Sequence, residues 1–135
     1  MDGQFKILVV DDDPINLKIV TAALKDDYEV INALNGKEAI AQIKKHKPDL
    51  VVMDVMMPGL SGFDVSILIK SYESFSNTPI IFMTASDNSE KKLSGLELGG
   101  IDYLFKPVDF TRLRELVRNH IALKEAPAIL NRSKA

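Results

Sequence analysis

The chain contains no cysteine, so it has neither disulfide bonds nor thiolate chemistry. It has no excess of one charge either, because 17 basic and 19 acidic residues give a net charge of −2. That balance offers no electrostatic reason for direct binding to nucleic acid or to a membrane surface. The first apolar run stops at Val10 and follows the acidic residue Asp2, unlike a signal peptide or a membrane span. We therefore expect a cytoplasmic protein without membrane contact.

The length and composition suit one globular domain. A chain of 135 residues, 46% hydrophobic and 27% charged, is long enough to bury a substantial core. The last residues, 124–135, contain Pro127 and small polar side chains, so we interpret them as a frayed tail or the start of a linker. The sequence therefore predicts one domain over residues 1–123.

Short apolar runs alternate with segments of helical periodicity, a pattern that predicts parallel strands joined by helical crossovers. The expected strands are Lys6–Val10, Tyr28–Ala33, Leu50–Met53, Ile80–Met83 and Asp102–Phe105. The expected helices are Pro14–Lys25, Gly36–His46, Gly62–Tyr72, Ser89–Gly99 and Phe110–Leu123, the last with Asp109 as its N-cap. We predict an α/β, doubly wound, five-stranded parallel sheet with strand order 2-1-3-4-5 and helices on both faces.

Polar side chains follow four of the predicted strands. Asp11 and Asp12 come after the first strand, Asp54 after the third, Thr84 after the fourth and Lys106 after the fifth. The carboxyl ends of parallel strands share one edge of the sheet, and strands 1 and 3 are neighbours in the predicted order. We therefore expect the three carboxylates to converge, with Thr84 and Lys106 approaching from the other side.

Such a cluster of carboxylates repels itself unless cations compensate for the charge. Lys106 supplies one cation, and a hard divalent metal such as Mg²⁺, which prefers oxygen ligands, would supply more. A metal, a lysine and a threonine facing one another make a site for a phosphoryl group, with Asp54 placed as the nucleophile. Each residue alone has a simpler interpretation, because Asp often caps a helix, Lys is usually solvated and Thr often ends a strand. The combination from separate strands is what favours the site.

Other polar residues fit structural roles. Asp13 before Pro14 suits a helix start. The two histidines, His46 and His120, are isolated along the chain, and we interpret them as surface or packing residues and not as metal ligands.

Four stretches, "ILVVDDDPIN", "DLVVMDVMMPGLSGFDV", "PIIFMTA" and "GGIDYLFKP", resemble response-regulator receiver domains. The resemblance covers roughly Phe5 to Leu123. It implies that Asp54 is the phosphoacceptor and that Asp12 is a direct Mg²⁺ ligand, while Asp11 acts mainly through water. It also implies that the backbone carbonyl of Met56 is a metal ligand.

The same resemblance assigns roles on the fourth and fifth strands. Thr84, Lys106 and the backbone of Ala85 would contact the phosphoryl group, and Pro107 would follow a cis peptide bond. Thr84 and Tyr103 would form the switch. When Thr84 moves toward a phosphoryl oxygen, we expect the Tyr103 phenol to move from solvent to a buried position.

The implied function is that of a phosphoacceptor signalling switch in a two-component system. A histidine kinase or a histidine phosphotransfer protein would donate the phosphoryl group, and the chain would assist its own phosphorylation and dephosphorylation without turning over a separate substrate. The surface formed by Ser89–Gly99, the fifth strand and Phe110–Leu123 would contact an output domain or a second copy. The stretch "DYLFKPVDFTRLRELVRNHIALK" is similar to receivers in front of cyclic-di-nucleotide enzymes or in sensor-kinase hybrids.

Three other classes of protein share parts of this pattern. A haloacid-dehalogenase-type phosphatase needs Asp-x-Asp-x-Thr after its first strand, but "DDDPIN" lacks the threonine and the chain leaves no room for a cap domain. A flavodoxin-like FMN carrier needs a Ser/Thr/Gly-rich phosphate loop where this chain has three aspartates, and a colourless preparation would exclude it. A purely structural interaction module has no need for the complete set of site residues.

Overall fold

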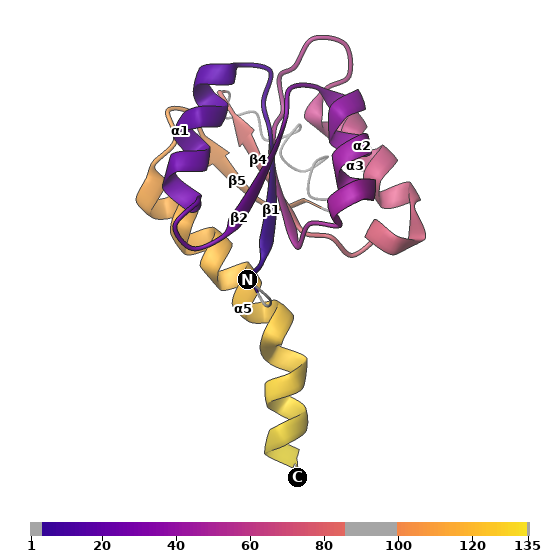
Figure 1. Cartoon of the computed structure of the whole chain (residues 1–135), viewed down its shortest axis with the longest axis vertical. Coiled ribbons are helices and arrows are strands. Elements are labelled where there is room, and N and C mark those ends of the chain that lie inside the picture. Colours follow the sequence, from indigo (N-terminus) through magenta and orange to yellow (C-terminus); the bar gives the residue numbers. More distant parts are fainter. Residues whose placement is uncertain (1–3, 86–99, 135) are drawn as a thin grey trace.

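The computed structural model describes residues 4–85 and 100–134 and shows a single sheet between two layers of helices (Figure 1). Strands and helices alternate as predicted over residues 6–84, where a 3₁₀ turn (η1) precedes the fourth strand, and the fifth strand is followed by the last helix. The strands are β1 (Lys6–Val10), β2 (Glu29–Ala33), β3 (Leu50–Asp54), β4 (Ile80–Thr84) and β5 (Gly100–Phe105). The helical elements are α1 (Pro14–Leu24), α2 (Gly36–His46), α3 (Gly62–Ser71), η1 (Glu73–Phe75) and α5 (Phe110–Lys134). The predicted helix Ser89–Gly99 lies outside the described residues.

All neighbouring strands are parallel, and their order is β2-β1-β3-β4-β5, which confirms the predicted topology. β3 and β4 each extend one residue past the predicted end, so that Asp54 and Thr84 are the last residues of their strands. The central position of β3, between β1 and β4, places Asp54 in the middle of the carboxyl edge.

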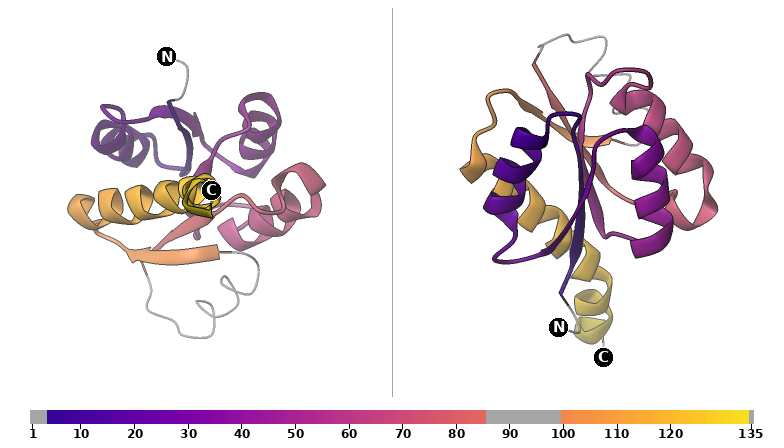
Figure 2. Two further views of the ribbon diagram at one scale, coloured as in Figure 1. Left: turned by 90° about the horizontal axis from the view of Figure 1, so that it is seen from below. Right: turned by 45° about the horizontal axis from the view of Figure 1, so that its top comes forward.

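Each strand presents alternate side chains to the two helical layers. Ile7 and Val9 pack with α1 and α5, whereas Leu8 and Val10 pack with α2 and α3. Figures 1 and 2 show this arrangement, with α1 and α5 covering one face of the sheet and α2 and α3 covering the other. The central strands are apolar on both faces because both faces are buried.

Local capping explains where the helices begin. The Asp13 carboxylate accepts a hydrogen bond from the Ile15 backbone N–H (2.9 Å) at the start of α1. Ser61 and Asp64 form a capping box at the start of α3. The Asp109 carboxylate accepts from the first turn of α5, which confirms it as the predicted N-cap.

The last helix is longer than its sequence pattern indicates. α5 continues from Leu123 to Lys134, so the predicted helix end at Leu123 is wrong, whereas the interpretation of residues 124–135 as a tail or the start of a linker stays a prediction. Its final turns project beyond the sheet at the bottom of Figure 1. Neither α5 nor any other helix within the described ranges has the combination of length and apolar character that crossing a bilayer requires.

Candidate functional site

Strand alternation decides which side chains meet at the carboxyl edge. In β1, the face that carries Ile7 and Val9 continues to Asp11, and in β3 the corresponding face ends at Asp54. Lys106 follows Leu104 on the same face of β5. The two carboxylates and the amine therefore converge on the side of the sheet that α1 and α5 cover.

Three carboxylates lie together at this edge. Oxygen atoms of Asp11, Asp12 and Asp54 all lie within 4.8 Å of one another. Asp11 and Asp54 are only 1% and 2% exposed, whereas Asp12 is open to solvent. Asp13 does not join the cluster, because its carboxylate caps α1 and its backbone N–H donates to Asp11 Oδ1 (3.0 Å). The sequence therefore distinguished Asp13 correctly from the three clustered residues.

Lys106 partly neutralises this negative charge. Its Nζ lies 3.1 Å from Asp54 Oδ1 and 3.7 Å from Asp11 Oδ2. The Met56 backbone N–H also donates to Asp54 Oδ1, at 3.3 Å. These contacts fall short of full compensation, because burial still raises the pKa of the Asp54 carboxyl from 3.8 to about 6. The hydrogen bond from Lys106 opposes this rise, and the charge of Asp11 adds to it.

The carboxylate group fits a hard divalent cation. Asp11 Oδ2 is fully buried, yet it accepts no hydrogen bond from any residue in the described ranges. A buried carboxylate oxygen is costly unless it has a donor or a metal partner. Oxygen ligands, with open space on the solvent side for water, are what Mg²⁺ prefers. The residues present therefore match the predicted metal, and neither histidine belongs to the cluster.

Thr84 and Tyr103 lie next to this site but on the other side of the sheet. Tyr103 belongs to the same hydrophobic cluster as Phe82, and the centroids of these two rings are 5.5 Å apart. Phe82 lies two residues before Thr84 in β4 and therefore on the same face. Tyr103 also lies 6.4 Å from the Phe63 ring and is only 7% exposed. The expectation that its phenol begins in solvent is therefore wrong for this structure, because rings from two other elements cover it. Ala85, which directly follows β4, is exposed.

The turn after β5 holds Lys106 and Pro107. The peptide bond between them is cis, as predicted. The Lys106 backbone N–H donates to the Thr84 carbonyl at 2.8 Å, so the two strand ends remain joined beside the site. The structure thus brings Asp11, Asp12, Asp54 and Lys106 together and places Thr84 at the adjoining strand end.

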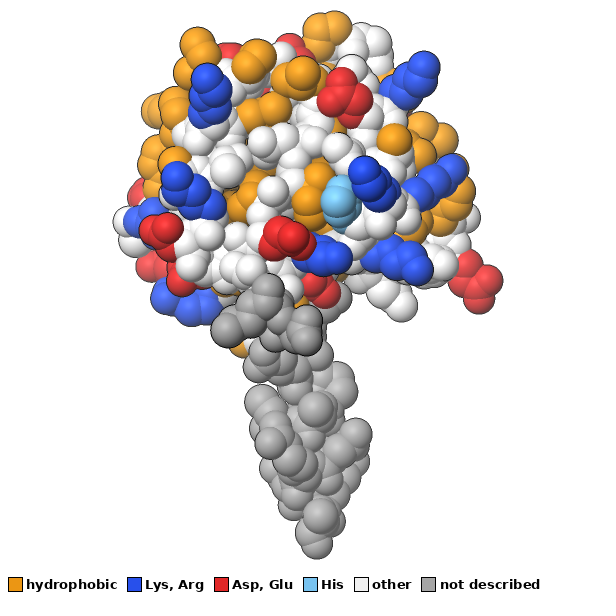
Figure 3. Space-filling view, in the orientation of Figure 1, with side chains coloured by type: hydrophobic (Ala, Val, Ile, Leu, Met, Phe, Trp, Pro, Cys, Tyr) orange, Lys and Arg blue, Asp and Glu red, His pale blue; other side chains and the backbone are white. Residues whose placement is uncertain are grey.

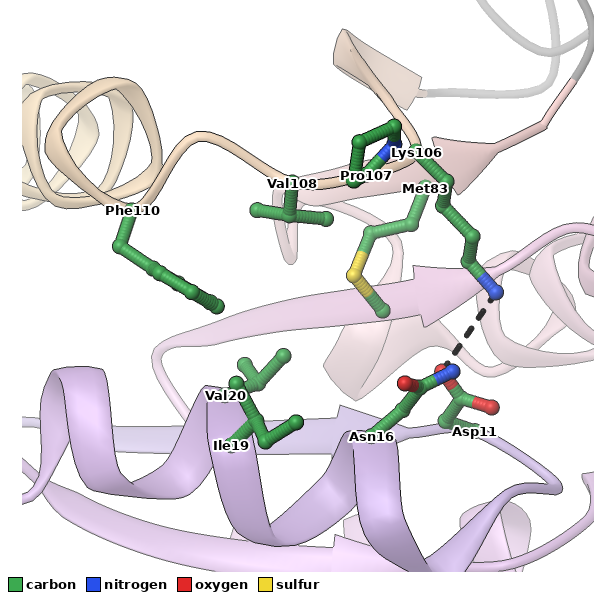
Figure 4. Close-up of a pocket in the computed structure, with 9 residues that line it drawn as sticks. All are labelled: Asp11, Asn16, Ile19, Val20, Met83, Lys106, Pro107, Val108 and Phe110. Carbon is green, nitrogen blue, oxygen red and sulfur yellow. Dashed lines mark ion pairs between the residues drawn. The ribbon is translucent and has the colours of Figure 1, made fainter.

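A mainly apolar cavity of about 300 Å³ adjoins the site on the α1 side (Figure 4). The ion pair between Lys106 and Asp11 lies at one end of it, and Phe110 lies at the other. Asn16 and Met83 also line this cavity, and sequence reasoning did not assign either of them to the site. No motif indicated them, because their neighbours across the cavity come from a distant turn.

Sequence reasoning also missed Gly62 at the start of α3. Its backbone N–H donates to the Val55 carbonyl (2.9 Å) directly behind the site. A Cβ added at Gly62 would collide with the Asp54 backbone carbonyl and lie 3.0 Å from the Val55 Cα. Only glycine permits this approach, which holds the chain after β3 against the start of α3.

The raised pKa of Asp54 predicts an unusual dependence of stability on pH. Well below pH 3.8 the carboxyl is protonated in both the folded and the unfolded chain. As the pH rises from 3.8 toward about 6, the unfolded chain loses this proton while the folded chain keeps it, so the free energy of unfolding falls and then levels off. The expected loss is about 3 kcal/mol.

We expect Asp54→Asn to lack this fall and to be more stable than the wild type above about pH 6, with similar stability near pH 4. Urea unfolding of both proteins from pH 4 to 8, in buffer with a metal chelator, measures the difference. Parallel stability curves would show that the folded protein does not raise the pKa of this carboxyl.

The protein has a doubly wound parallel sheet of the flavodoxin-like α/β class, and acidic side chains and a lysine gather at its carboxyl edge. The comparisons with known proteins are more specific. The family model for the response regulator receiver domain matches residues 7–118, and the chain belongs to this family.

The relatives support this membership. PilH of Pseudomonas aeruginosa is 37% identical over 118 residues, covering 87% of this chain and 98% of PilH. A probable cyclic di-GMP phosphodiesterase of Vibrio cholerae is 37% identical over 128 residues, covering 95% of this chain but only 29% of that protein. The solved structure of the chemotaxis protein CheY4 of Vibrio cholerae matches with a TM-score of 0.83 and 31% identity, covering 87% of this chain and 98% of that one. The chain therefore spans less than a third of the phosphodiesterase.

Proposed function

We propose that this chain is a phosphoacceptor switch of a two-component system and that Asp54 accepts the phosphoryl group. The observation that carries the proposal is the position of the Asp54 carboxylate, buried at the end of the central strand between Lys106 and the carboxylate of Asp11. This arrangement supplies a nucleophile, a cation and a metal-binding group within one small region.

The residues that would hold Mg²⁺ are Asp11, Asp12, Asp54 and the backbone carbonyl of Met56. When bound, the metal neutralises charge on the carboxylates and on the phosphoryl oxygens. Asp11 acts mainly through water in this proposal, and Asp12 binds directly from the solvent side.

The reaction is a phosphoryl transfer from a phosphohistidine of a histidine kinase or histidine phosphotransfer protein. An Asp54 carboxylate oxygen attacks phosphorus, the bond between phosphorus and the imidazole nitrogen breaks, and its electron pair returns to the imidazole. Lys106, the Thr84 hydroxyl and the Ala85 backbone N–H contact the phosphoryl oxygens as negative charge develops on them. Positioning and charge neutralisation account for most of the catalysis that such a transfer needs.

Incubation with acetyl phosphate tests the proposal without a cognate kinase. With Mg²⁺ we expect the intact mass of the wild-type protein to rise by one phosphoryl group, and with a chelator we expect no rise. Hydroxylamine should then remove the group, because it cleaves acyl phosphates and leaves phosphate esters of hydroxyl groups intact. A hydroxylamine-resistant adduct, or no adduct with Mg²⁺ present, would contradict the proposed chemistry.

Binding of Mg²⁺ should depend on Asp12 and not on Asp13. Asp12 has an oxygen in the carboxylate cluster, whereas the Asp13 carboxylate is engaged in capping α1. We expect Asp12→Ala to weaken Mg²⁺ binding by about ten-fold or more. Asp13→Ala should bind as the wild type does and lose only about 1 kcal/mol of stability with its cap. NMR titration with Mg²⁺ measures both affinities, and equal losses would refute the distinction.

We propose that the signal leaves the site through Thr84 and Tyr103. The Thr84 hydroxyl would move toward a phosphoryl oxygen, and the changed space beside it would alter how the buried Tyr103 ring packs. The surface that responds would include β5, α5 and residues 89–99, of which the last lie outside the described residues. A phosphoryl group shifts this equilibrium only by its differential affinity for the two arrangements.

Replacing the Thr84 hydroxyl should uncouple this response from binding. We expect beryllofluoride, a phosphoryl mimic, to shift amide NMR signals across β5 and α5 in the wild type. Thr84→Ala should bind the mimic but show distant shifts reduced by more than half, whereas Thr84→Ser, which keeps a hydroxyl, should retain them. Undiminished distant shifts in Thr84→Ala would exclude this route.

Partners follow from the family. A receiver domain in a two-component system works with a histidine kinase, and Figure 3 shows hydrophobic side chains gathered along the upper edge of the molecule, near the site. Exposed apolar residues at that edge include Ile15, Met56 and Leu60. We propose this edge for the phosphodonor and the β5–α5 surface for an output domain or a second copy. We do not propose that the chain turns over a separate substrate. Its cytoplasmic location stays a prediction.

A further inference from the structure

A second groove, lined by charged, polar and apolar groups, lies far from Asp54, toward the amino ends of the strands. It has a volume of about 460 Å³ and lies between the loop after α1 and the first half of α5. Tyr28, which borders it, directly precedes β2, so the groove lies toward the amino ends of the strands. The lining residues are Asp27, Tyr28, Thr111, Arg114, Glu115 and Arg118.

The charged lining of this groove consists of two arginines, Arg114 and Arg118, and two carboxylates, Asp27 and Glu115. Arg114 and Arg118 are four residues apart on α5 and therefore lie one turn apart on the same face of the helix. Neither guanidinium forms an ion pair or a hydrogen bond with another residue in the described part of the chain. By contrast, Glu115 forms an ion pair with Arg112, at 3.6 Å, on the surface of α5.

Tyr28 connects the two sides of the groove. Burial raises the pKa of its hydroxyl, the charge of Asp27 raises it further, and the positive charge of Arg118 opposes both. All three of these residues line the groove. The phenol keeps its proton at neutral pH and remains a hydrogen-bond donor.

We propose that this groove binds the phosphate monoester of a small hydroxylated molecule. The guanidinium groups of Arg114 and Arg118 hold the phosphate, and the hydroxyls of Tyr28 and Thr111 donate to it. Asp27 accepts hydrogen bonds from hydroxyl groups elsewhere on the same ligand. The site is independent of the phosphoacceptor chemistry proposed for Asp54.

Three features favour an organic phosphate over other occupants. Two guanidinium forks with two hydroxyl donors offer more hydrogen bonds than one carboxylate can accept, but they match the terminal oxygens of a phosphate group. The groove volume falls in the range of small-molecule sites and exceeds what a bare oxyanion fills. The free carboxylate of Asp27 would repel a second anion, so the rest of the ligand must be neutral and able to donate hydrogen bonds.

A solvated charged surface is the simplest alternative, since both arginines are exposed. That alternative predicts that anions bind weakly and unselectively, with an affinity that depends only on the charge of the anion. Arg112 provides the matched control, because it lies on the same helix and carries the same charge, but is paired with Glu115 and does not line the groove.

NMR titration of the full chain in a metal chelator tests the site with three probes: ribose 5-phosphate, inorganic phosphate and ribose. We expect ribose 5-phosphate to shift the amide signals of Tyr28 and Thr111 without shifting that of Asp54, and to bind more tightly than inorganic phosphate. Ribose should not bind. Arg114→Ala and Arg118→Ala should each weaken binding at least ten-fold, while Arg112→Ala stays within two-fold of the wild type.

Two further variants test the division of roles. Arg118→Lys keeps the charge but loses the planar fork, and should still weaken binding several-fold. Asp27→Asn should weaken the binding of ribose 5-phosphate. Its affinity for inorganic phosphate should stay unchanged or rise. The proposal would be overturned if Arg112→Ala and Arg118→Ala lost equal affinity for ribose 5-phosphate. It would also be overturned if ribose bound, or if ribose 5-phosphate and inorganic phosphate bound with equal affinity. Because all these positions are at the surface, unchanged thermal unfolding is expected and serves as the folding control.

Discussion

Asp54→Asn is expected to take up no phosphoryl group from acetyl phosphate under conditions that phosphorylate the wild type completely. Asparagine keeps the shape of the side chain but replaces the nucleophilic carboxylate by an amide. Asp54 is the last residue of the central strand and has the Lys106 amine 3.1 Å from its carboxylate, a combination that Asp11 and Asp12 lack. The loss should therefore be total and not partial. Intact mass spectrometry measures the expected difference of one phosphoryl group.

Two controls make this result specific. Asp13→Asn should be phosphorylated like the wild type, since Asp13 only caps α1 and asparagine is also a good cap. Lys106→Ala should remain folded and bind Mg²⁺ but fail to transmit the phosphoryl signal to β5. A full mass increase in Asp54→Asn would show that another residue is the acceptor.

Gly62→Ala is expected to cost about 3 kcal/mol or more in the free energy of unfolding. The added methyl group would collide with the Asp54 carbonyl, which is backbone and cannot rotate away as a side chain does. Relief requires the start of α3 to separate from the end of β3, which would also displace Asp54. We therefore expect a large loss of stability together with slower phosphorylation by acetyl phosphate.

Gly59 provides the comparison for this effect. Its φ of +80° is unfavourable for alanine, but an added Cβ would meet nothing within 4 Å. Gly59→Ala should therefore cost only about 1–2 kcal/mol from backbone strain. Urea unfolding of the two variants separates the two causes, and equal losses would mean that the close approach at Gly62 is unimportant.

The fold and the acidic site were largely predictable because they depend on local patterns. Short runs of β-forming residues identify the strands, and a polar site residue ends or directly follows four of the five. Asp11, Asp54 and Lys106 were therefore predictable as neighbours once the strand order was assumed. Asp13 was also predictable, since an Asp before a Pro at a helix start is a local signal.

What could not be predicted depends on how distant segments meet. The close approach at Gly62 follows from the path of the loop after β3, and no residue pattern reveals that path. Tyrosine is amphipathic, so the sequence around Tyr103 does not show whether its ring is buried or exposed. The ring is buried because Phe63 and Phe82 pack against it. The end of α5 was misjudged because Pro127 usually stops a helix, whereas the Lys, Glu, Ala and Leu residues around it are strong helix formers.

The length of α5 makes it a lever. Its 25 residues extend about 37 Å, and its first turn follows the Lys106–Pro107 turn beside Asp54. Each degree by which the helix tilts at this pivot displaces its far end by about 0.7 Å. Pro127 lacks the N–H that would close a hydrogen bond to the Leu123 carbonyl, so the helix has one backbone hydrogen bond fewer at that turn. Any small tilt of α5 would therefore produce a larger displacement at the far end of the helix than at its first turn.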